Sequence, residues 1–147
     1  KIFKNQENNI KEEDVASGYI YILKSKSAKE EIKSINNLYK IGFTTLEVHK
    51  RIRNAENDPT FLMAPVTVET YFECYNFGPK QLEDSLHGFF GDSQLSVDVY
   101  DNDGIRHSPR EWFIAPLEII VKAAEMMMSG DIVNHYYDRE TQQIKQK

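Results

Sequence analysis

Two short runs decide the fold of this chain: Gly18-Tyr19-Ile20-Tyr21-Ile22-Leu23 and Leu38-Tyr39-Lys40-Ile41-Gly42-Phe43. Both are rich in β-branched and aromatic residues, which are the types enriched in strands. The polar segment 24–37 between them is long for a hairpin loop, so we expect it either to carry a helical turn or to be mobile. The two runs therefore predict two consecutive strands of one sheet.

Further elements follow along the chain. Three segments have apolar residues three and four positions apart, with proline or glycine at their ends, and so predict helices. Two others have the composition of strands. The helices are expected over residues 46–57, 79–90 and 116–130, and the strands over residues 66–75 and 111–114. This order predicts an α+β domain, a small and mainly antiparallel β-sheet flanked by three helices.

Two of these segments allow finer predictions. Residues 95–104 are acidic and end in Asp-Asn-Asp-Gly, which indicates a short hairpin or a loop. In the strand over residues 66–75, side chains should alternate between the two faces of the sheet. One face is then expected to hold Val66, Val68, Thr70, Phe72 and Cys74.

The length of 147 residues favours one domain. Residues 1–16 are rich in Asn, Glu and Lys and are expected to form a linker or a frayed segment. Residues 17–130 are predicted to be the domain itself, and residues 131–147 a C-terminal extension. Because the chain begins with Lys1, we expect it to be part of a longer protein, fused to or assisted by another domain.

Charge and composition exclude several classes of protein. The net charge is −5, which argues against a uniformly basic nucleic-acid binder. The segment from Ile20 to Thr60, however, contains eight basic residues and only five acidic ones. That local excess indicates a phosphate-facing region or a set of solvated lysines. No apolar run approaches the ~20 residues of a membrane span, and no secretory signal is visible. The single cysteine, Cys74, indicates a reducing, cytoplasmic setting.

Several side chains suggest chemistry. Tyr19 and Tyr21 share one face of the first strand, and Tyr39 could face them from the second strand if the two pair antiparallel. Tyrosines of this kind are also common as amphipathic core residues. On the following helix Arg51 and Arg53 lie on opposite sides of the apolar stripe, so only one of them can reach a site on the sheet.

A carboxylate lies one helical turn from a histidine on the next helix. Glu83 and His87 are four residues apart and therefore neighbours at the rim of the core. A single carboxylate can hold Mg²⁺, which keeps most of its water ligands. His87 is open to three roles beside a structural one: phosphate contact, proton relay or partner of Glu83. Zinc is disfavoured because the pair offers only two ligands.

Taken in order, these motifs resemble the GIY-YIG nuclease superfamily, in its bacterial and phage branch. The motifs that carry the resemblance span Ser17 to Phe113: they are Gly18-Tyr19-Ile20-Tyr21, Tyr39-Lys40-Ile41-Gly42 with Thr44 two residues later, Glu83 to His87, and Glu111-Trp112-Phe113. The resemblance implies a GIY-YIG-like fold and a GIY-YIG-type endonuclease. It leaves unplaced an asparagine that members of the superfamily often carry near the metal.

The resemblance also implies roles for individual residues. Tyr21 would be the base that activates water, and Tyr39 would position the water or support Tyr21. Arg51 would stabilise the transition state, and Glu83 would bind Mg²⁺ or Mn²⁺. Two sets of further residues are expected near these four. Supporting residues are Tyr19, His49, Arg53 and His87; contacts to nucleic acid are Lys40, Lys50, Arg51 and Arg53.

The sequence thus predicts a metal-dependent endonuclease domain that hydrolyses DNA phosphodiester bonds by tyrosine-assisted attack of water. The alternative is a catalytically inactive nucleic-acid-binding or protein-interaction module with the same fold. A small-molecule phosphodiesterase is a second rival. The residues do not distinguish DNA from RNA, nor do they give the cut sequence, the oligomeric state or the pathway.

Overall fold

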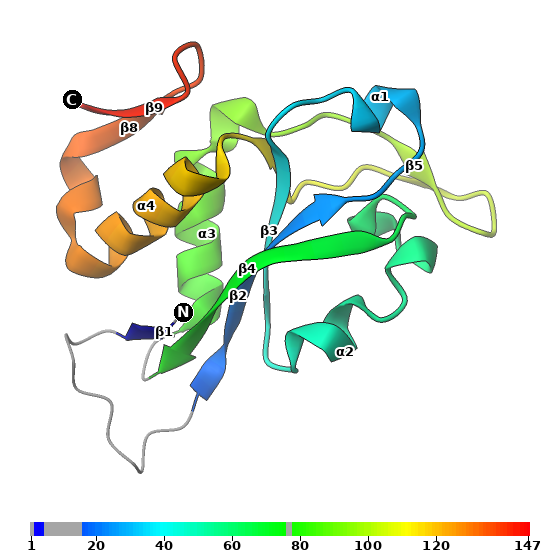
Figure 1. Cartoon of the computed structure of the whole chain (residues 1–147), viewed down its shortest axis with the longest axis horizontal. Helices are drawn as coiled ribbons and strands as arrows, with labels where there is room; N and C mark the ends of the chain where they lie inside the picture. The colour runs from blue at the N-terminus through cyan, green and yellow to red at the C-terminus, as the bar shows by residue number, and fades with distance from the viewer. Residues whose placement is uncertain (1, 5–15, 76–77) are drawn as a thin grey trace.

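A computed structural model describes residues 2–4, 16–75 and 78–147. Its main sheet has five strands in the order β1-β4-β2-β3-β7 (Figure 1). Their bounds are β1 Ile2–Lys4, β2 Ala16–Ser25, β3 Leu38–Thr44, β4 Val66–Tyr75 and β7 Trp112–Ile114. Two separate hairpins complete the strands: β5 Val99–Tyr100 with β6 Arg106–His107, and β8 His135–Asp138 with β9 Gln143–Gln146.

Helices lie between these strands. The α-helices are α1 Glu30–Lys33, α2 Val48–Ile52, α3 Pro79–Phe89 and α4 Leu117–Ser129. Short 3-10 turns are η1 Ala55–Asn57, η2 Pro59–Phe61, η3 Gly91–Ser93 and η4 Asp131–Asn134. The predicted α+β class, with a mainly antiparallel sheet, is confirmed. The helix expected over residues 46–57 is shorter, because α2 ends at Ile52 and η1 takes the place of the last residues.

The pairing of the strands fixes which side chains share a face. β2 is antiparallel to both β3 and β4, and β1 is parallel to β4. Across β2 and β3, Tyr21 lies opposite Gly42 and Ile22 lies opposite Ile41. Because alternate residues point to opposite faces, the isoleucines and Tyr21 belong to different faces of the same sheet.

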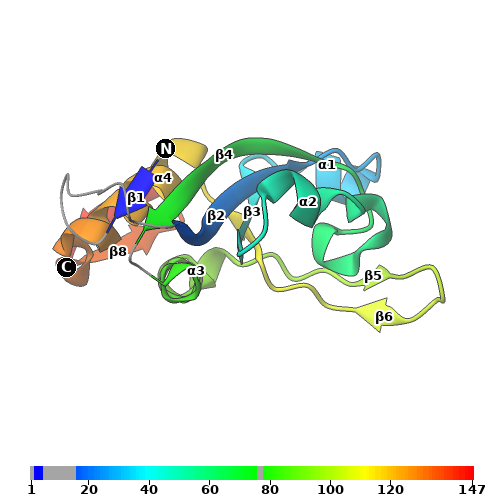
Figure 2. The same ribbon diagram turned by 90° about the horizontal axis from the view of Figure 1, so that it is seen from below.

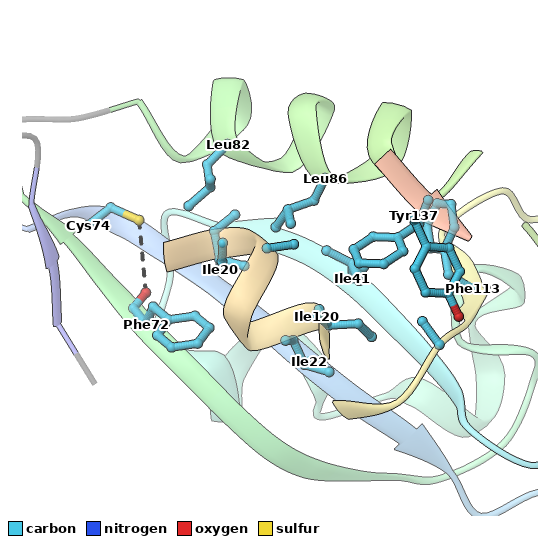
Figure 3. Close-up of a cluster of buried hydrophobic side chains, with 14 residues drawn as sticks. Ile20, Ile22, Ile41, Phe72, Cys74, Leu82, Leu86, Phe113, Ile120 and Tyr137 are labelled. Atoms are coloured by element: carbon cyan, nitrogen blue, oxygen red, sulfur yellow. Dashed lines mark hydrogen bonds between the residues drawn. The ribbon is translucent and has the colours of Figure 1, made fainter. Parts of the chain in front are cut away.

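One face carries the larger apolar core. α3 and α4 cover it, and Figure 3 shows Leu82 and Leu86 directed from α3 toward Ile20 and Ile41 of the strands. The cluster continues through Ile120 of α4. These side chains are almost fully buried, and each buried aliphatic side chain contributes roughly 1.5–3 kcal/mol.

α2, η1 and η2 lie on the opposite face. Figure 1 shows α2 on the other side of the crossing strands from α3 and α4. The cluster here is smaller: Tyr21, Leu23, Val48, Ala55 and Phe61 form it. This face therefore has fewer buried apolar groups and leaves room for polar side chains.

The alternation expected along β4 is wrong for half of the strand. A register shift lies where Ile22 pairs with Thr70 but Leu23 pairs with Val68, so β4 has one extra residue there, a β-bulge. As a result Phe72 packs in the α3–α4 cluster, whereas Val68 packs beside Tyr21. A bulge cannot be read from periodicity, because it breaks the periodicity.

The ends of the chain fall partly within the described residues. Most of the predicted linker over residues 1–16 lies outside them. The predicted C-terminal extension forms η4 and the β8–β9 hairpin, and its Tyr137 belongs to the α3–α4 core cluster. Within the part of the chain that the structure describes, no helix is both long enough and apolar enough to cross a bilayer.

Candidate functional site

The candidate site lies on the α2 face and begins with Tyr21. Its ring lies across Gly42 of the neighbouring strand: a Cβ added to Gly42 would come within 2.5 Å of the Tyr21 Cζ and hydroxyl oxygen. Only glycine allows this close approach. Gly42 is therefore part of the site, since it lets the phenol cross β3.

Lys40 lies two residues before Gly42, and so on the same face. Its side chain is fully buried and its Nζ donates a short hydrogen bond to Glu111 Oε1, within an ion pair. Burial lowers the pKa of Lys40, the Arg51 charge lowers it further, and Glu111 opposes both. A buried cation with a carboxylate partner is thus held beside the phenol.

Arg51 is the second cation of this face. Its Nη1 lies 3.6 Å from Asp58 Oδ2, and its Cζ lies 4.7 Å from the centre of the Phe61 ring. Lys40 Nζ lies 4.9 Å from the centre of the same ring. Two cations therefore contact one buried aromatic ring, an arrangement that cation–π attraction favours.

The local sequence explains how this corner is built. Asp58 Oδ1 accepts hydrogen bonds from the backbone N–H and the hydroxyl of Thr60, and Pro59 begins η2. The Trp112 indole donates to the Thr60 carbonyl at 3.0 Å, which ties η2 to β7. Phe61 and Asp58 are thereby fixed in position under the two cations.

Glu83 and His87 lie along the free edge of β3, beyond the end of β7. Glu83 Oε2 accepts the Phe43 N–H at 3.0 Å, and His87 Nε2 donates to the Ile41 carbonyl at 2.7 Å. Glu83 Oε1 accepts from Lys80 Nζ at 3.1 Å. Both side chains thus satisfy backbone groups that a neighbouring strand would otherwise pair.

Electrostatic effects link these groups. Burial raises the pKa of Tyr21 above its ordinary value of about 10, and the Arg51 charge opposes the rise. The charges of Glu111 and Glu83 also raise the pKa of Tyr21. Burial raises the pKa of Glu83, and the charge of Glu111 raises it further. The charges of Arg51, Glu111 and Glu83 therefore all act on the Tyr21 phenol.

Tyr39 does not join this group. It lies three residues from Gly42, on the opposite face, where it packs against the α3–α4 cluster. Burial raises its pKa, and the charges that add to the rise belong to Glu69 and Glu118. The expectation that Tyr39 faces Tyr21 across the sheet is therefore wrong; Lys40 occupies that side of β3.

The remaining predicted residues lie at varied distances from the site. Tyr19 shares the face of Tyr21 and is half-buried, and His49, Lys50 and Arg53 are exposed on or next to α2. His87 is half-buried and its charge lowers the pKa of Glu83. Of the open roles for His87, the contacts favour that of a partner to Glu83 and to the edge of β3.

The carboxylates are the side chains of this site that could hold a divalent ion. Among the described residues, no group of three or more His, Cys, Asp or Glu side chains is arranged to hold a metal. Glu83 nevertheless has two hydrogen bonds for about four acceptor sites, and a second carboxylate, Glu111, raises its pKa. Oxygen donors of this kind suit Mg²⁺ or Mn²⁺ ions that keep several waters.

Sequence reasoning missed part of the site. The sequence predicts Lys40 only as a contact to nucleic acid, and it gives no indication of Asp58 or Phe61. The one sequence signal for Lys40 is its spacing of two from Gly42, which places both on one face. Phe61 belongs to a short 3-10 turn and Asp58 precedes it, and such irregular segments have no periodic signal.

The fold and the site define the chain as an α+β domain with a polar cluster on one sheet face. It belongs to the T5orf172 domain family, whose model matches residues 18–128. It is similar to the "Uncharacterized protein YeeC" of Bacillus subtilis (strain 168), with 40% identity over 131 residues. That match covers 89% of this chain and 34% of YeeC, so the chain spans about a third of the length of this relative. No solved structure matches.

This result corrects the assignment to the GIY-YIG nuclease superfamily. The family model that matches is that of the T5orf172 domain, a distinct family. The physical reason for the error is visible in the second motif: the residue that shares the face of Tyr21 is Lys40, and the tyrosine beside it lies on the other face.

Proposed function

We propose that this chain is an endonuclease domain that hydrolyses DNA phosphodiester bonds with the aid of a divalent metal ion. The observation that carries the proposal is the arrangement of a buried phenol and two cations on the α2 face of the sheet, with two carboxylates at the adjoining edge of β3. Such a set can neutralise a phosphate and move a proton, which are the two requirements of water attack on phosphorus. The residues are Tyr21, Lys40, Arg51, Glu83 and Glu111.

Each side chain has a proposed role. Arg51 donates parallel hydrogen bonds to the phosphate, and Lys40 adds a second positive charge behind it. Tyr21, as phenolate, accepts the proton of the attacking water. Because burial raises its pKa, the phenolate is scarce at neutral pH but is a strong base once formed.

Glu83 would hold Mg²⁺ or Mn²⁺, and Glu111, whose charge raises the pKa of Glu83, would add negative charge to the site. When bound, the ion would supply positive charge to the non-bridging oxygens of the phosphate. Lys80 is largely exposed and contacts Glu83 Oε1, so it can leave that oxygen to a metal ligand shell. Glu83 itself stays fixed through its hydrogen bond from the Phe43 N–H.

A second candidate function is a catalytically inactive nucleic-acid-binding or protein-interaction domain. The burial of the site favours it: Tyr21 is 1% exposed and Lys40 is 0% exposed. For hydrolysis with Tyr21 as the base, by contrast, α2 or η2 would have to move to admit the phosphate. Arg51 and Glu111, by contrast, are partly exposed and can contact a partner directly.

One assay separates the two functions. Supercoiled plasmid is incubated with the protein in Mg²⁺, in Mn²⁺ and in chelator, and DNA binding is measured in parallel by gel mobility shift. We expect metal-dependent nicking that Glu83→Gln abolishes while DNA binding persists. Asp84→Asn is the matched control, because Asp84 is the adjacent exposed carboxylate. Binding without nicking by the wild-type protein in both metals would establish the second function.

We also propose a cytoplasmic location and a role for additional segments of a longer protein in choosing the DNA site. The buried free thiol of Cys74 supports the first, since reduced cysteines are typical of that compartment. The greater length of YeeC supports the second.

A further inference from the structure

A second concave site lies on the same sheet face, on the other side of Tyr21. Its volume is about 320 Å³, and it is bounded by β2, β4 and the start of α2. Tyr19 and Tyr71 form its aromatic wall, with ring centres 6.0 Å apart and planes at 66°. The polar cluster around Lys40 lies toward β3, whereas this pocket lies toward β4.

The charges of the pocket differ from those of the polar cluster. Glu47, Glu73 and the imidazole of His49 line it, and none of the residues described as lining it is a lysine or an arginine. The Tyr75 hydroxyl donates to Glu73 Oε2 at 2.8 Å, which orients that carboxylate. The pocket therefore combines two aromatic rings with two negative charges.

We propose that this pocket binds an organic cation, an alkylammonium or guanidinium group. Aromatic faces attract such cations, and the attraction increases as water is displaced. The carboxylates of Glu47 and Glu73 neutralise the charge, whereas they would repel a phosphate. A neutral nucleobase could hydrogen-bond to at most one of the two carboxylates and would leave the second one partly desolvated.

The cation can come from two sources: a free small molecule or the side chain of a protein. Both present the same group to Tyr19 and Tyr71. The pocket does not depend on the proposed hydrolysis, because its rings and carboxylates are separate from Lys40, Arg51 and Glu83. Failure of the nicking assay therefore leaves this inference standing, and the reverse also holds.

An NMR titration of the tyrosine ring signals tests the proposal. The probes are tetramethylammonium, for a free cation, and the peptides Gly-Lys-Gly and Gly-Arg-Gly, for a protein side chain. Neutral controls of similar size are tert-butyl alcohol and Gly-Ala-Gly. We expect saturable shifts of Tyr19 and Tyr71 with at least one cationic probe, and the probe that binds more tightly identifies the source.

Matched variants locate the binding. Tyr71→Ala and Glu73→Gln should each weaken it roughly tenfold. Tyr136→Ala, another exposed tyrosine, and Glu69→Gln, on the same strand but outside the pocket, should leave it unchanged. Equal binding of the neutral controls, binding of adenosine monophosphate in place of the cations, or no shift with any cationic probe would overturn the proposal.

Discussion

The two faces of the central sheet differ although the same strands build both. On the α3–α4 face, Ile20, Ile22 and Ile41 are buried among aliphatic and aromatic side chains. On the α2 face, Tyr21 and Lys40 are buried just as deeply, among charged groups. Burial on the α3–α4 face therefore stabilises the fold, whereas burial on the α2 face strengthens the interactions between charged groups, because the local dielectric constant is low.

The largest expected effect compares the two tyrosines across this division. Tyr21→Phe should reduce nicking about a thousandfold, because it removes the proposed base. Tyr39→Phe should change nicking by less than about twofold, because Tyr39 lies on the other face. Plasmid nicking rates measure both, with thermal melting to check that each variant is folded. Equal losses in the two variants would contradict the division of the faces.

A core substitution should act on stability alone. Ile22→Ala removes a fully buried side chain from the α3–α4 face, and we expect the free energy of unfolding to fall by about 3 kcal/mol. Nicking per folded molecule should stay near the wild-type rate. Urea unfolding gives the first quantity. A loss below about 1 kcal/mol would mean that this face is not the main source of stability.

The pH dependence of nicking tests the electrostatics of the α2 face. The pKa of Tyr21 is raised, so the phenolate fraction grows about tenfold for each pH unit below that pKa. The rate should therefore rise from pH 7 to pH 9 without reaching a plateau. A flat or steadily falling profile over this range would exclude the phenolate as the base.

The smallest expected effect concerns the cost of burying a charge. Lys40→Met removes a buried ammonium, and Glu111 can turn to water because it is partly exposed. We expect the free energy of unfolding to stay within about 1 kcal/mol of wild type, while nicking falls about tenfold. Lys33→Met, at an exposed lysine of α1, is the control and should change neither.

Much of the fold could be predicted from local patterns. The runs 18–23 and 38–43 became β2 and β3, and the stripe of Pro79–Phe89 became α3. The turn residues that end at Gly104 connect β5 to β6 in a hairpin, which Figure 2 shows extending below α2. Periodicity succeeds here because each of these elements buries a regular face.

The sequence by itself determined the class of fold and the positions of the aromatic strands. It also pointed to Tyr21, Arg51 and Glu83 as residues of one candidate site. Only the tertiary structure decided that Lys40, and not Tyr39, shares a face with Tyr21, because register depends on the hydrogen bonds between β2 and β3. It also decided that Asp58 and Phe61 meet Arg51, since side-chain contacts between irregular segments leave no periodic trace in a chain.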